Sequence, residues 1–144
     1  MITNLDSNRG RKLARLLVVE DDPAVLDIVQ TRLEMAGYET HRARDGKSAT
    51  DMLATMRPDA IVLDLNMPRM DGFAVLEWMA RRSHTADIPV LVLTARHGEQ
   101  DVRRAISAGA SDYLAKPFRN DILLARVERL LRSRLRPVED DVLI

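Results

Sequence analysis

Short apolar runs alternate along this chain with longer segments in which apolar residues recur every three or four positions. The apolar runs lie at 16–19, 60–63, 88–94 and 113–115, and a more polar run of strand-forming residues lies at 38–42. An unbroken apolar run between turn residues is typical of a strand buried on both faces of a sheet. The segments between the runs have the spacing of amphipathic helices. The pattern therefore predicts five strands, each followed by a helix.

The predicted helices begin and end at residues that favour helix termini. Three aspartates occupy N-cap positions: Asp22, Asp45 and Asp71. Glycines or Arg–Pro pairs stand at the expected C-terminal ends: Gly37, 57–58, Gly109 and 136–137. The first two helices are therefore expected from 23 to about 36 and from 46 to the pair at 57–58. The third should begin after Asp71 and end at about 82. The last two are expected from 99 to 108 and from about 120 to 136–137.

The helical spacing also predicts which side chains face the core. In the first helix one face carries Val25, Ile28, Val29, Leu33 and Ala36, and in the fourth helix the inward positions are Val102, Ala105 and Ile106. Strict alternation of strand and helix implies a parallel sheet covered by helices on both faces. The mixed second strand suits an edge and the first, third and fourth suit the centre. We therefore expect a doubly wound α/β fold, flavodoxin-like, with five helices and strand order 2-1-3-4-5.

Length and composition fit one globular domain and exclude several functions. The chain has 144 residues, of which 46% are hydrophobic and 31% are charged. No segment has the ~20 apolar residues of a membrane span, and the first twelve residues do not resemble a secretory signal. Cysteine is absent, which excludes disulfides and thiolate metal sites and agrees with a cytoplasmic location. Equal numbers of basic and acidic residues, 22 each, argue against direct nucleic-acid binding by this segment.

Polar side chains follow the predicted strands at the edge where their carboxyl ends meet. These residues are Glu20, Asp21, Asp64, Thr94 and Lys116. The first and third strands are expected to be neighbours, so their three carboxylates would lie close together and raise one another's pKa. Either Lys116 or a bound hard cation such as Mg²⁺ could neutralise them. A carboxylate, a hydroxyl, an ammonium and a hard cation together indicate a phosphoryl site, and an aspartate can itself accept the phosphoryl group.

Several motifs in this sequence resemble the receiver domain of two-component response regulators, the CheY-like domains. They are VVEDDP at 18–23, VLDLNMP at 62–68, MDGF at 70–73, LTA at 93–95 and GASDYLAKPF at 109–118. The resemblance extends over about 13–135, with the motifs in the family's order and spacing. It implies that a sensor histidine kinase or a histidine phosphotransfer protein phosphorylates Asp64.

The resemblance also implies a role for each of the other site residues. Mg²⁺ would be bound by Asp21, Asp64 and the backbone carbonyl of Asn66, with Glu20 acting mostly through water. Thr94 and Lys116 would contact the phosphoryl group, with Thr94 and Tyr113 as the switch pair and a cis peptide bond before Pro117. Glu20 departs from the commoner aspartate at its position. Arg96 and Asn66 would flank the path of the hydrolytic water.

The last predicted helix is similar to that of receivers from winged-helix transcription factors, which dimerise through the fourth helix, fifth strand and fifth helix. A homodimer of this kind could use Asp101, Asp112 and Arg126 in cross-subunit ion pairs. Ile122, however, stands where that group usually has an acidic residue. The remaining partner would be a downstream effector or output domain.

The expected organisation is a flexible N-terminal lead-in at 1–12, a receiver domain at 13–136 and a C-terminal tail at 137–144. Eight residues follow Arg136, too few for an output module, so the chain is either a stand-alone receiver or part of a longer regulator. It is not expected to be an enzyme beyond promoting its own phosphorylation and dephosphorylation. The alternatives are an aspartate-dependent phosphatase and an adaptor that does not depend on phosphorylation.

Overall fold

A computed structural model of the protein describes residues 13–96 and 98–135, without the side chains of 134 and 135. The predicted lead-in at 1–12 and tail at 137–144 therefore lie outside the described residues. Five parallel strands form one sheet in the order β2-β1-β3-β4-β5, which confirms the predicted fold and strand order. Within the described ranges, no helix combines the length and the apolar character that crossing a bilayer requires.

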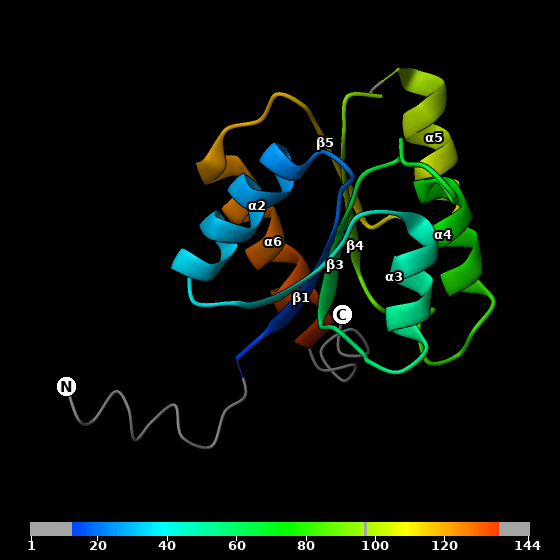
Figure 1. The fold of residues 1–144 in the computed structure, drawn as a ribbon, viewed down its shortest axis with the longest axis horizontal. Helices are drawn as coiled ribbons and strands as arrows, with labels where there is room; N and C mark the ends of the chain where they lie inside the picture. The colour runs from blue at the N-terminus through cyan, green and yellow to red at the C-terminus, as the bar shows by residue number, and fades with distance from the viewer. Residues whose placement is uncertain (1–12, 97, 136–144) are drawn as a thin grey trace, which may run out of the picture.

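Strands and helices alternate along the whole described chain (Figure 1). The strands are β1 (Arg15–Val19), β2 (Glu39–Ala43), β3 (Ala60–Leu63), β4 (Val90–Thr94) and β5 (Asp112–Ala115). The helices are α2 (Pro23–Met35), α3 (Gly46–Leu53), α4 (Gly72–Ala80), α5 (Glu99–Ser107) and α6 (Asn120–Leu135). The helix α3 ends earlier than the Arg57–Pro58 pair predicted, since Ala54 is already its C-cap.

Two apolar cores lie on opposite faces of the sheet. Successive strand residues point to alternate faces, so Leu17 and Val19 join one core while Leu16 and Val18 join the other. Figure 1 shows α2 and α6 on one side of the sheet and α3, α4 and α5 on the other. Burial on both faces explains why β1, β3 and β4 read as unbroken apolar runs.

Three of the predicted core positions are wrong, and one of them, Ala36, is the exposed C-cap of α2. Ile28 of α2 is 50% exposed and Ile106 of α5 is 48% exposed, whereas Leu26 of α2 is fully buried. A side chain on a helix covers the turn that precedes it, so the buried stripe is rotated from the one chosen by spacing alone. The sheet buries Leu26, Val29 and Leu33 of α2, and it buries Ala105 of α5.

The three predicted N-caps are confirmed. Asp22 accepts a hydrogen bond from the Ala24 amide at 2.9 Å. Asp45 accepts one from the Ser48 amide at 2.7 Å, and Asp71 accepts one from the Ala74 amide at 2.9 Å. Asp22 and Asp45 start their helices shortly after the ends of β1 and β2, whereas Asp71 starts α4 after a longer loop that follows β3.

Gly72 lets α4 begin against the end of β3. A Cβ atom at this position would lie 2.4 Å from the Asp64 carbonyl oxygen and 2.7 Å from the Leu65 Cα. Both of these are backbone atoms, so a side chain here would force the helix and the strand apart. The close approach therefore sets the geometry of the loop that follows Asp64.

Candidate functional site

Three carboxylates converge where β1 and β3 end. Val19 and Leu63 are partners in the ladder, and the Asp64 amide donates to the Val19 carbonyl at 3.0 Å. Glu20, Asp21 and Asp64 each offer a ligand oxygen, and these oxygens lie within 4.8 Å of one another. Glu20 is 3% exposed and Asp64 is 5% exposed. The site therefore concentrates negative charge in a poorly solvated place.

Lys116 reaches this carboxylate cluster from the end of β5. Its amide donates to the Thr94 carbonyl at 3.0 Å, which aligns the two strand ends. Its ammonium lies 2.6 Å from Glu20 Oε1 and 3.5 Å from Asp64 Oδ2. The peptide bond between Lys116 and Pro117 is cis. One cation thus serves two buried carboxylates.

Glu20 shows that this compensation is incomplete. The pKa of Glu20 is raised to about 7, mainly by burial of the side chain and also by the charge of Asp64, although the hydrogen bond from Lys116 lowers it. Loss of hydration therefore outweighs the single ammonium. The sequence predicted that either Lys116 or a bound cation neutralises the carboxylates. Because Lys116 alone is not sufficient, the site has room for both.

The donor set fits a hard divalent cation. The cluster offers carboxylate oxygens without histidine or cysteine, which is the chemistry that Mg²⁺ prefers. Two oxygens on opposite sides of Mg²⁺ lie about 4 Å apart, a span comparable to that of the cluster. Such an ion would supply the positive charge that Glu20 and Asp64 lack.

Asn66 lies two residues beyond Asp64 in the loop between β3 and α4. Its amide donates to Asp64 Oδ1 at 3.4 Å, so this loop closes over the carboxylate. Its side-chain oxygen accepts a hydrogen bond from Arg96 Nη1 at 3.3 Å. Arg96 also pairs with Asp101 of α5 at 2.8 Å and therefore ties this loop to the start of α5.

The two predicted switch residues lie on adjacent strands and differ in their hydrogen bonding. Thr94, at the end of β4, is fully buried, and its hydroxyl accepts from the Arg96 amide at 3.3 Å. Tyr113 is the β5 partner of Val92 and packs against the core on the α3–α5 face. In the described part of the chain its buried hydroxyl makes no hydrogen bond. Burial raises the pKa of Tyr113, and the nearby Asp101 adds to this shift.

The three residues considered for cross-subunit pairs are engaged within the chain. Asp112 lies 3.3 Å from Arg126 and 2.7 Å from Arg129, both on α6. Asp101 holds Arg96, as described above. A dimer that used them would have to exchange these partners.

One contact near the site has no clear signal in the sequence. Arg69, in the loop after Asp64, binds Asp45 at the start of α3 through three contacts of 2.9–3.1 Å. Neither residue belongs to the predicted phosphoryl site. Only the fold brings the two segments together, so local sequence patterns could not identify this pair.

Comparison with known proteins gives a consistent family. The model of the response regulator receiver domain matches residues 16–128. The chain is 47% identical over 120 residues to the DNA-binding dual master transcriptional regulator RpaA of Synechocystis, with 83% of this chain and 50% of that protein covered. It is 48% identical over 126 residues to the response regulator MprA of Mycobacterium avium, with 88% and 54% covered. The chain thus spans about half the length of these relatives.

Solved structures agree with this match. The signal receiver domain of a signal transduction histidine kinase from Syntrophus aciditrophicus has a TM-score of 0.80 and 36% identity, covering 86% of this chain and 94% of that one. The receiver domain of a sensor histidine kinase from Pseudomonas aeruginosa, with a magnesium ion in its active-site cleft, has a TM-score of 0.78 and 29% identity, covering 83% and 98%.

Proposed function

The chain belongs to the response regulator receiver domain family, and from this we propose that Asp64 accepts a phosphoryl group from a sensor histidine kinase or a histidine phosphotransfer protein. The observation that carries the proposal is the convergence of Glu20, Asp21 and Lys116 on Asp64. A carboxylate oxygen of Asp64 forms the new bond to phosphorus as the bond between phosphorus and the donor nitrogen breaks. The imidazole is then released.

The neighbouring residues position and neutralise the incoming group. The transferred phosphoryl group carries charge on three oxygens. The Lys116 ammonium, 3.5 Å from Asp64 Oδ2, and the Thr94 hydroxyl each offer a donor to it. Asp21, Asp64 and the Asn66 backbone carbonyl, with Glu20 nearby, would hold Mg²⁺, which would supply the remaining positive charge. The residues present fit such an ion, as the carboxylate cluster indicates.

The switch follows from movement of Thr94 and Tyr113. When the Thr94 hydroxyl turns to the phosphoryl group it gives up its hydrogen bond with the Arg96 amide, and Tyr113 fills the vacated space. Reversing an equilibrium from 1:99 to 99:1 needs ~5.5 kcal/mol, whereas one charge-assisted hydrogen bond supplies ~1.5–3 kcal/mol. Thr94, Lys116 and Tyr113 therefore act together.

The signalling surface is formed by α5, β5 and α6, and its shape changes with the position of the Tyr113 side chain. A downstream effector or an output domain binds this surface, and a homodimer through it is the second mode of use. We assign the receiver to 13–136 and a cytoplasmic location on the basis of the family. No enzymatic activity is assigned beyond promotion of its own phosphorylation and dephosphorylation.

Two other functions fit less well. An aspartate-dependent phosphatase normally carries two aspartates one residue apart after the first strand, whereas here Glu20 and Asp21 are adjacent and Asp64 follows β3. An adaptor that ignores phosphorylation would not need the buried carboxylates beside Lys116. Incubation with acetyl phosphate and Mg²⁺ separates the three. A receiver takes up one phosphoryl group per chain, a phosphatase turns over a phosphate ester steadily, and an adaptor does neither.

A further inference from the structure

The loop between β3 and α4 carries Asn66, and its distal half adopts a demanding backbone conformation. Arg69 has a φ of 68°, and no other non-glycine residue in 13–96 or 98–135 has a positive φ. Side chains with a Cβ atom disfavour this left-handed region. The next residue, Met70, donates its amide to the Pro68 carbonyl at 2.8 Å, which closes a tight turn around Arg69. Contacts from elsewhere in the fold must hold an arginine in this conformation.

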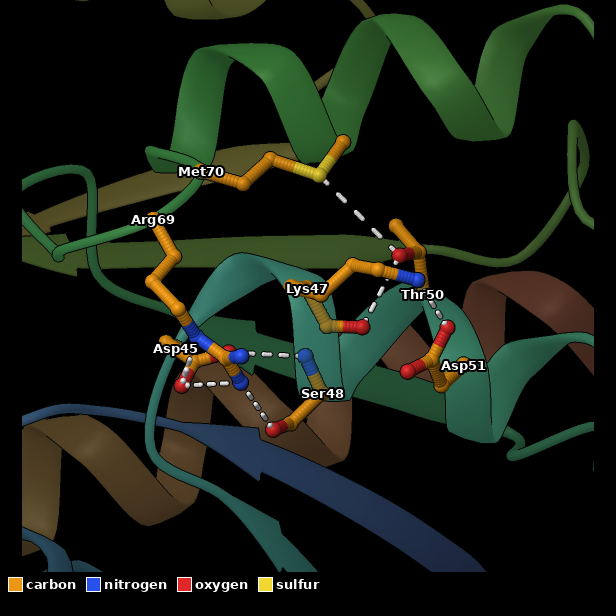
Figure 2. A network of polar contacts seen from close by, with 7 residues as sticks. All are labelled: Asp45, Lys47, Ser48, Thr50, Asp51, Arg69 and Met70. Atoms are coloured by element: carbon orange, nitrogen blue, oxygen red, sulfur yellow. Dashed lines mark hydrogen bonds and ion pairs between the residues drawn. The ribbon is translucent and has the colours of Figure 1, made fainter.

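The side chain of Arg69 makes these contacts with the start of α3, as Figure 2 shows. Its Nε lies 3.1 Å from Asp45 Oδ2, and its Nη2 lies 3.1 Å from Oδ1 and 2.9 Å from Oδ2. The same Nη2 donates to the Ser48 hydroxyl at 3.2 Å. This is the two-pronged geometry that arginine forms with a carboxylate and that lysine cannot reproduce.

Asp45 is a fixed anchor for this arginine. Its carboxylate caps α3 by accepting from the Ser48 amide, and its side chain is 15% exposed. The Ser48 hydrogen bond and the Arg69 guanidinium both lower the pKa of Asp45. One carboxylate thus starts α3 and holds the loop that follows the proposed phosphoacceptor.

Backbone packing brings the same two segments into direct contact. A Cβ atom at Gly46 would lie 2.0 Å from the Met70 carbonyl oxygen and 2.7 Å from its carbonyl carbon. The first residue of α3 therefore abuts the residue that follows Arg69. The loop is therefore held against α3 by two adjacent contacts. One is the ion pair of Arg69 with Asp45, and the other is the close approach of Met70 to Gly46.

We propose that Arg69 is a positioning residue, which with Asp45 forms a latch that sets the loop 65–71 and so the Asn66 carbonyl for cation binding. This inference rests on the proposed function. At the near end the loop is fixed by the Asn66 amide on Asp64, and at the far end by Arg69 on Asp45. Without the latch the carbonyl is less well placed, and the ion must order the loop when it binds.

The test is a calorimetric titration of the whole chain with Mg²⁺ alone. Arg69→Gln and Asp45→Asn should each weaken Mg²⁺ binding about three- to tenfold, and the double variant should be no weaker than either single one. Asparagine retains an acceptor for the α3 cap, so Asp45→Asn keeps the helix start. Lys47→Gln is the matched control. It breaks an exposed pair with Asp51 on the same helix (Figure 2), 2.7 Å long, and should leave Mg²⁺ affinity within twofold.

Arg69→Gly separates positioning from folding. Glycine adopts a positive φ without steric cost, so this variant keeps the turn and loses only the latch. We expect normal thermal stability, weakened Mg²⁺ binding, and faster amide exchange at 66–70 in the metal-free chain. Wild-type affinity and wild-type exchange in Arg69→Gly would overturn the latch. A wild-type chain that binds no Mg²⁺ would instead overturn the proposed function, so the two failures are distinguishable.

Discussion

The Lys116 ammonium lies 2.6 Å from a carboxylate oxygen of Glu20, a residue 96 positions earlier in the chain. Both side chains are largely withdrawn from water, with 18% of Lys116 and 4% of Glu20 exposed. A buried carboxylate that has lost its partner is costly. The pair therefore links the stability of the fold to the chemistry of the site.

Replacement of Lys116 by methionine should destabilise the protein at pH 8. The substitution keeps the length of the side chain but leaves Glu20 and Asp64 without their ammonium. We expect a loss of about 1–3 kcal/mol in the free energy of unfolding, measured by urea titration. Lys47→Met, which breaks the exposed pair with Asp51, should cost less than about 0.5 kcal/mol. Equal costs for the two variants would contradict the importance assigned to the buried pair.

Stability without metal should fall as the pH rises through about 7. Folding raises the pKa of Glu20 from 4.5 to about 7, so between these values the folded state binds a proton that the unfolded state has released. The stabilisation from this proton is complete below about pH 4.5 and is lost as the pH passes 7, up to about 3 kcal/mol in all. Urea titrations in EDTA from pH 5 to 8 measure this slope.

Glu20→Gln is the control for this pH dependence, because the amide does not titrate. Its stability should change little across the same range. The lowered pKa values of Glu39 and Asp45 act only at more acidic pH and do not contribute. A slope that persists unchanged in Glu20→Gln would assign the effect to another group.

Mg²⁺ should bind more tightly at pH 8 than at pH 6. At pH 6 the ion must displace a proton from the Glu20 carboxyl group, whereas at pH 8 this group is already ionised. Calorimetric titration at the two pH values should show a difference of about fivefold or more. Because Glu20→Gln has no proton to displace, its affinity should vary much less with pH. Equal wild-type affinities would show that Glu20 does not face the ion.

Tyr113→Phe should have little effect on stability, since the buried hydroxyl makes no hydrogen bond with the described residues. We expect a change within about 0.5 kcal/mol by urea titration. Tyr113→Ala should cost about 2–4 kcal/mol, because the ring packs against the apolar core. A large loss in the phenylalanine variant would reveal a partner for the hydroxyl.

Gly72→Ala should be strongly destabilising. The new methyl group would meet the Asp64 carbonyl oxygen at 2.4 Å, and this backbone atom cannot rotate away. A loss of about 2–4 kcal/mol in the free energy of unfolding is expected. Gly98→Ala is the control, because a Cβ there meets nothing within 4 Å and should be nearly neutral. Comparable losses in both variants would argue against a tight approach at Gly72.

The sequence was sufficient for the fold because its signals were redundant. The apolar runs of β1, β3 and β4 indicated central strands, the mixed β2 indicated an edge, and aspartates marked three helix starts. Side-chain direction within a helix was less well determined. Spacing alone assigned Ile28 and Ile106 to the core, although both are about half exposed.

The candidate site could be predicted for those residues whose position follows from the parallel sheet alone. The ends of parallel strands meet at one edge, so Glu20, Asp64 and Lys116 could be grouped before any coordinates were known. The pair Arg69–Asp45 could not, since it joins two segments whose relative position depends on the packed helices. The family resemblance placed Arg96 and Asn66 beside the same water path, but it did not predict the hydrogen bond between them. The internal partners of Asp112 likewise depend on how α6 lies along β5.

The most direct test of the central claim is mass spectrometry of the intact protein after incubation with acetyl phosphate and Mg²⁺. The wild-type chain should gain one phosphoryl group, which peptide mapping assigns to Asp64, and Asp64→Asn should gain none. Asp71→Asn, an N-cap change a few residues away, should label as the wild type does. Undiminished labelling of Asp64→Asn would contradict the assignment of Asp64 as the phosphoacceptor.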